Sequence, residues 1–129
     1  MGGRGTYLIK ERKYNTLFTI DNIKVIESNE PGNVSAPYNS ITPERIYATT
    51  KIINGIRELK TITYYDNDRQ IVIRIDLTAS HAGLKEHAHY FKNGVKTFAA
   101  LNDEQKKLVS KIRKEITEYE FSKKQIFDL

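Results

Sequence analysis

Residues Ile71 to Phe91 read IVIRIDLTASHAGLKEHAHYF, and the rest of the sequence is best understood around this stretch. Its first half alternates in the way that is typical of a β-strand. The alternation places Ile71, Ile73, Ile75 and Leu77 on one side, and Val72, Arg74 and Asp76 on the other. Its second half holds every histidine of the chain, His81, His87 and His89. We expect this half to form a loop after the strand.

The residues before this stretch predict two further strands. Ile46 to Ile53 and Ile56 to Tyr65 are rich in β-branched and aromatic residues, and Asn54-Gly55 separates them. Asn-Gly is the preferred pair for a two-residue type I′ hairpin turn. A second reversal at Asp66 to Arg69 leads into a strand from Gln70 to Leu77. We therefore predict a meander of three antiparallel strands.

The N-terminal part adds short elements. Residues 1 to 16 are glycine-rich and then basic, and we expect a basic arm that precedes a single domain of residues 17 to 129. Residues 17 to 20 and 23 to 26 predict one or two additional strands, since Asp21-Asn22 between them favours a turn. The segment Ser28 to Ser40 contains two prolines and is polar, which predicts a loop.

The C-terminal part changes to helical spacing. Between Leu101 and Glu120 an apolar stripe is formed by Leu108, Val109, Ile112, Ile116 and Tyr119. Asn102 and Gln105 have the spacing of a capping box at the start of a helix. We predict the α+β class, in which an antiparallel β-meander packs against a C-terminal amphipathic helix. The apolar tail Phe121 to Leu129 would dock onto the domain or join two chains as a homodimer.

Composition limits the chemistry and the partners. The chain has 129 residues, a formal net charge of +5 and no cysteine. Disulfides, thiolate metal sites and thiol nucleophiles are therefore excluded, and a reducing compartment, the cytoplasm of a bacterial host, fits. No apolar run reaches the roughly 20 residues of a membrane span, so we expect no membrane partner. The basic balance favours anionic partners, nucleic acid first.

The histidines suggest a site, with three readings left open. His87 and His89 are two residues apart and would share a face in extended chain. With Asp76 or His81 they could bind a divalent first-row metal. Alternatively, His81, His87 and His89 could supply acid–base catalysis without a cofactor, since imidazole titrates near neutral pH. In the third reading they are solvent-facing loop residues with no shared role.

A basic and aromatic surface is a separate candidate for binding nucleic acid or a protein partner. Strand tyrosines could stack bases beside phosphate-binding cations, although strand tyrosines more commonly pack half-buried. The candidate binding residues are Arg45, Arg57, Lys60, Tyr64 and Arg74.

Several motifs, in order along the chain, resemble short proteins from prophages and mobile elements of Gram-positive bacteria. The matching motifs are Met1 to Gly5, Lys60 to Asp66, Ile75-Asp76-Leu77, His81, His87-Ala88-His89 and Leu101 to Glu104. The chain also resembles, more weakly, histidine-bearing toxin domains of the nuclease type. That weaker resemblance implies an RNase-like nuclease that uses the histidines.

The chain departs from the prophage pattern at two places. Thr78-Ala79 stands where the pattern has Asp-His, and Glu86 stands where it has proline. Two candidate acid, base or ligand positions are therefore missing, which favours binding over catalysis. We expect a small phage-type binding protein that acts on nucleic acid or on a host nucleic-acid-handling defence protein, as anti-CRISPR inhibitors do. A histidine-dependent nuclease is the alternative.

Overall fold

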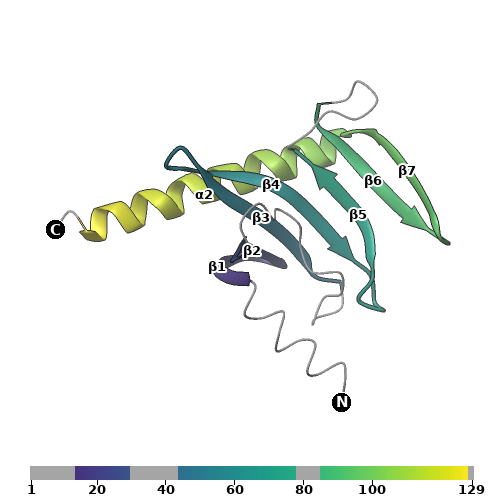
Figure 1. The fold of residues 1–129 in the computed structure, drawn as a ribbon, viewed down its shortest axis with the longest axis horizontal. Coiled ribbons are helices and arrows are strands. Elements are labelled where there is room, and N and C mark those ends of the chain that lie inside the picture. The colour runs from purple at the N-terminus through teal and green to yellow at the C-terminus, as the bar shows by residue number, and fades with distance from the viewer. Residues whose placement is uncertain (1–13, 30–43, 78–84, 128–129) are drawn as a thin grey trace, which may run out of the picture.

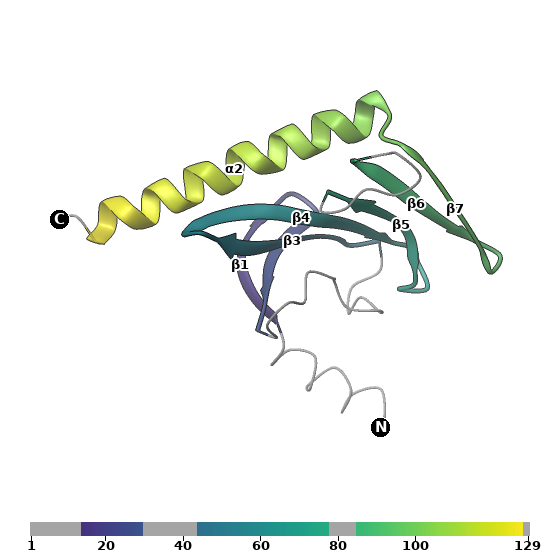
Figure 2. The same cartoon turned by 45° about the horizontal axis from the view of Figure 1, so that its top comes forward.

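The computed structural model describes residues 14–29, 44–77 and 85–127, with side chains as far as 124. Seven strands form one sheet in sequence order: β1 (Tyr14–Ile20), β2 (Ile23–Ser28), β3 (Ile46–Ile53), β4 (Ile56–Tyr65), β5 (Ile71–Asp76), β6 (His87–Lys92) and β7 (Val95–Ala100). One long helix, α2 (Asp103–Phe127), follows β7 and lies along one face of the sheet (Figure 1, Figure 2). The predicted α+β class, a meander packed against a C-terminal helix, is confirmed.

The predicted turns explain the antiparallel pairs. Asn54 and Gly55 have φ angles of 53° and 80°, and they join β3 to β4 in the geometry that Asn-Gly favours. Asn93 and Gly94 repeat it, with 51° and 76°, between β6 and β7. In the turn between β4 and β5, Asp66 Oδ1 accepts hydrogen bonds from two backbone N–H groups.

Three features of the sheet differ from the prediction. β2 and β3 run parallel, because a long connection rather than a tight turn separates them. β1 begins at Tyr14, so the strand includes the last residues of the expected arm. The register between β4 and β5 shifts between Tyr64 and Tyr65, so Ile71 packs on the face opposite to Ile73 and Ile75.

The main core lies between the sheet and α2. The helix begins with the predicted capping box: Asn102 and Gln105 each donate a backbone N–H to the side chain of the other, at 2.9 and 2.8 Å. Its apolar stripe contacts the sheet as predicted. The buried residues of this core are Ile23, Val25, Ala48, Leu59, Ile62, Ile75, Ala88, Leu101, Val109, Ile112 and Ile116. Among the described residues, no helix has the length and apolar character needed to cross a membrane.

The opposite face has a different character. An apolar cluster there holds Ile26, Tyr47 and Tyr65, with the two tyrosine rings 5.4 Å apart. Burial also raises the pKa of the Tyr65 hydroxyl, which stays neutral. These tyrosines therefore pack instead of offering open rings to bases. Beside this cluster, towards β5 and β6, the same face is lined by buried polar residues.

Ile112 tests the packing of the helix on the sheet. Its side chain is fully buried, so we expect Ile112→Ala to lower the free energy of unfolding by about 3 kcal/mol and Ile112→Val by about 1 kcal/mol. Urea denaturation followed by circular dichroism measures both. The exposed Ser110→Ala is the matched control on the same helix. Equal stability of the alanine variant and the parent would contradict the packing described here.

Candidate metal centre

His87 and His89 lie on a strand, not on a loop as expected. They are the first and third residues of β6, which pairs with β5 on one side and β7 on the other. The prediction was wrong because histidine is seldom buried, so the sequence HAHYFK did not indicate a strand with two buried histidines. Ala88 and Tyr90 face the helix, while the imidazoles face away from it. The two histidines therefore share a face, as their spacing predicted for extended chain.

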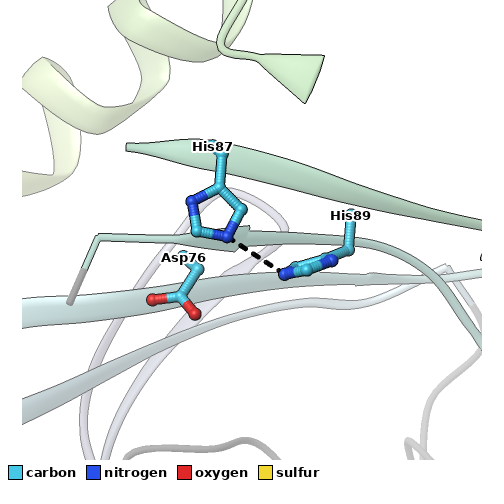
Figure 3. A group of neighbouring side chains, drawn as sticks. All are labelled: Asp76, His87 and His89. Carbon is cyan, nitrogen blue, oxygen red and sulfur yellow. Dashed lines mark hydrogen bonds between the residues drawn. The ribbon is translucent and has the colours of Figure 1, made fainter. Parts of the chain in front are cut away.

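Both imidazoles are buried and turned toward each other. His87 is 1% exposed and His89 is 5% exposed. Their Nε2 atoms are 3.1 Å apart, and the rings meet edge to face with centroids 4.8 Å apart (Figure 3). Phe98 on β7 lies beside His89, with ring centroids 6.4 Å apart. An aromatic and a neighbouring strand thus limit the movement of the His89 ring.

Asp76 completes a group of three potential ligands. In the register of β5 and β6, Asp76 is directly opposite His87, so the two side chains leave the sheet on the same face. One ligand atom from each of Asp76, His87 and His89 lies within 4.8 Å of the others. Figure 3 shows the carboxylate beside the facing imidazoles. Neighbouring strands therefore supply a His-His-Asp cluster from one surface of the sheet.

The spacing of the nitrogens suits a shared metal ion. Two nitrogens bound at about 2.0–2.1 Å in a tetrahedral site lie about 3.3 Å apart. The observed 3.1 Å requires only a small adjustment of either ring. Imidazole and carboxylate donors together fit first-row divalent ions such as Zn²⁺. With three protein ligands, such an ion would also be able to take water or substrate.

The same pair also has a metal-free form. One Nε2–H can donate to the other Nε2 when both rings are neutral, so the pair shares a single hydrogen bond. Burial, with the positive charge of Arg74 next in importance, lowers the pKa of His89. The His89 ring is therefore held in the neutral form that a metal requires.

The structure separates the other candidate residues. His81 lies outside the described residues. Arg57 points to the helix side, where it pairs with Glu27 at 2.9 Å and Glu120 at 3.1 Å. Tyr64 packs against the core beneath α2, whereas Arg74 lies on the opposite face beside His89.

Two other candidate binding residues lie on or beside the central strands. Lys60, at the register shift between β3 and β4, forms an ion pair with Glu58 at 3.0 Å. Arg45 immediately precedes β3, and its backbone carbonyl accepts a hydrogen bond from Tyr65. The five candidate binding residues thus do not form one surface.

Sequence reasoning did not identify the threonines of β4 as neighbours of the histidine site. Thr61 is opposite Asp76, and Thr63 is opposite Arg74, so both lie on the face of the imidazoles. The turns at Asn54-Gly55 and Asp66 to Arg69 mark the two ends of β4. They were the only sequence signal for how β4 aligns with β5.

Comparison with known proteins adds no relative. No protein-family model, curated protein or solved structure matches the chain.

The lowered pKa of His89 predicts how the stability of the metal-free protein varies with pH. The unfolded chain binds a proton at His89 more readily than the folded chain does. The contribution of neutral His89 to the free energy of unfolding is therefore complete above the ordinary histidine pKa of about 6.5. We expect it to be lost as the pH falls through the folded pKa. Urea denaturation of the chelator-treated protein between about pH 7.5 and 5.5 measures this. His89→Gln is expected to flatten the dependence, and an unchanged slope in that variant would contradict it.

Proposed function

We propose that the protein is a metal-dependent nuclease, acting on RNA, in which Asp76, His87 and His89 hold a divalent first-row ion. The observation that carries the proposal is the pair of buried imidazoles whose Nε2 atoms face each other at 3.1 Å beside a carboxylate. Burying two imidazoles beside a half-buried carboxylate is costly unless these groups are hydrogen-bonded or coordinate a metal. The net charge of +5 favours a polyanionic substrate.

The chemistry follows from the ligand set. Asp76, His87 and His89 would hold the ion, and the ion would lower the pKa of a bound water and polarise a phosphoryl oxygen. Asp76 is half-buried and is the last residue of β5. His81, which lies outside the described residues, remains the proposed assisting group.

Metal binding is the first test. We expect the chelator-treated protein to bind one Zn²⁺ or Co²⁺ per chain in calorimetry. His87→Gln and His89→Gln should each weaken binding at least about 100-fold, because each removes one of three ligands. Asp76→Asn should weaken it less, since the amide keeps an oxygen donor at the same position, although a weaker one than the carboxylate. Asp68→Asn, in the exposed turn between β4 and β5, is the control. Absence of binding in the folded parent would overturn the metal role.

Cleavage is the second test, with labelled RNA and DNA of the same sequence. Parent protein with metal is expected to cut RNA, and chelator or His87→Gln should abolish cutting. His81→Ala is expected to lower the rate partially. Cleavage that persists with chelator but is lost in the histidine variants would show acid–base catalysis by the histidines instead of metal-dependent catalysis. If the metal-loaded protein cuts neither RNA nor DNA, the proposed nuclease function is wrong.

A second candidate function is a phage-type or mobile-element-type binding protein, acting on nucleic acid or inhibiting a host nucleic-acid-handling protein. Exposed basic residues on α2 favour it, namely Lys106, Lys107, Lys111, Arg113 and Lys114. Lys111 and Arg113 form exposed ion pairs, with Asp21 and Glu86, which leaves Lys107 and Lys114 as the better probes.

This candidate predicts binding that depends strongly on salt. The affinity for RNA should fall steeply between about 50 and about 200 mM salt, because bound cations release counterions from phosphates. Fluorescence anisotropy measures it. The double variant Lys107→Glu with Lys114→Glu should weaken binding and reduce the slope, whereas Ser110→Ala should not. Binding unchanged by salt and by the double variant would exclude this surface.

A further inference from the structure

A row of polar side chains crosses the sheet beside the histidine pair. Thr63 on β4 is directly opposite Arg74 on β5, and Arg74 is directly opposite His89 on β6. Residues opposed in antiparallel strands project from the same face with Cβ atoms about 4.5–5.5 Å apart. Arg74 therefore lies between the metal-ligand cluster and the hydroxyl of Thr63.

Two buried polar atoms of this row have no hydrogen-bond partner among the described residues. Thr63 is 0% exposed, and its Oγ1 has no hydrogen-bond partner in the described part of the chain. The Nε atom of Arg74 is also buried and has none there. A buried donor left without a partner destabilises a protein, so such groups in a native fold indicate a ligand, an ion or water.

Arg57 shows how the same sheet treats a buried arginine elsewhere. Its side chain is 3% exposed, and it has two carboxylate partners, Glu27 and Glu120, as well as the Thr50 hydroxyl. Arg74 has no comparable ion pair among residues 14–29, 44–77 and 85–127. Within the part of the chain that the structure describes, Arg57 is thus neutralised internally and Arg74 is not.

The charge of a metal-loaded site would also favour binding of an anion. Two neutral imidazoles and one carboxylate offset only part of a divalent ion, and Arg74 adds a further positive charge beside His89. An uncompensated positive charge in a partly buried site attracts an anion. A guanidinium matches the geometry of phosphate, which it binds with two parallel hydrogen bonds.

We propose that Arg74 and Thr63 form a phosphate-binding subsite next to the metal centre, which receives a phosphate group of the nucleic acid. This inference rests on the proposed function for the identity of the substrate, but the subsite itself can be tested without catalysis. In it the guanidinium of Arg74 binds two phosphate oxygens, and the Thr63 hydroxyl donates to a third.

Binding of a 5′-mononucleotide, its parent nucleoside and inorganic phosphate to the metal-loaded protein is the experiment. The mononucleotide and phosphate should bind, and the nucleoside should not. Arg74→Gln should weaken binding of the mononucleotide by about tenfold or more, because a charge-assisted pair is lost, and Arg74→Lys should restore part of it. Zn²⁺ affinity should be retained in both variants, which separates the subsite from the metal centre.

Thr63→Val provides a matched pair with Thr49→Val. Both threonines are fully buried with unpartnered Oγ1 atoms, yet Thr49 is opposite Thr61 instead of Arg74. Neither variant should lose stability, because each removes a buried hydroxyl without a partner and keeps the shape. Only Thr63→Val should weaken binding of the mononucleotide.

Three results would overturn the subsite. They are equal mononucleotide affinity of the parent and Arg74→Gln, binding of the nucleoside as tight as that of the mononucleotide, and equal effects of the two threonine variants. Each can occur while Zn²⁺ binding and RNA cleavage persist, so failure of the subsite is distinct from failure of the nuclease. Conversely, a protein that binds phosphate through Arg74 but takes up no metal would overturn the proposed function and keep the subsite.

Discussion

The alignment of β5 with β6 is the constraint on which the candidate site depends. Asp76 is opposite His87, and Arg74 is opposite His89, so four polar groups leave two strands on one face. A shift of one residue in this pairing would send both imidazoles to the face of α2, among the aliphatic residues of the core. The hydrophobic pattern opposes that shift, because Ile75 and Ala88 are fully buried beneath the helix. The apolar face therefore holds the polar face in register.

The helix reinforces this arrangement from the other side of the sheet. Gln105, which closes the capping box, also donates from Nε2 to the Tyr90 hydroxyl at 3.0 Å. Tyr90 lies between His89 and Phe91 on β6 but faces the helix. The first turn of α2 is thus tied to the strand that carries both histidines. A ligand cluster supported in this way keeps its geometry without needing the metal to organise the strands.

Local signals predicted the elements well, and non-local contacts account for what they missed. Asn54-Gly55 and the spacing of Asn102 and Gln105 each describe their own neighbourhood, and each was correct. The alternation of β5 was correct from Ile73 to Asp76 but wrong at Ile71, where the register shifts. β6 was missed because its buried face carries two histidines, and histidine is not among the residues that usually fill a buried strand face. Arg57 was taken for a surface cation because its partners lie 30 and 63 residues away in the sequence.

The histidine cluster itself was predictable in part. Spacing placed His87 and His89 on one face, and Asp76 was named with them, because two-residue periodicity needs no tertiary knowledge. The neighbourhood of Arg74 and Thr63 was not predictable in that way. It depends on which residues of β4 and β5 are opposed, and a register shift at Tyr64 changes that alignment partway along the pair.

The parallel pairing of β2 with β3 has a consequence for how the chain folds. From β3 to β5 and from β6 to β7, each strand pairs with the next across a short turn, so these contacts are local and form quickly. The β1–β2 hairpin is separated from β3 by residues 29 to 45, so this pairing joins residues farther apart in the sequence and adds an entropic barrier. We expect this hairpin to dock last and to detach first. Its departure would remove Glu27 from Arg57 and so loosen the far half of the helix, which makes the N-terminal edge a natural point of cooperative opening.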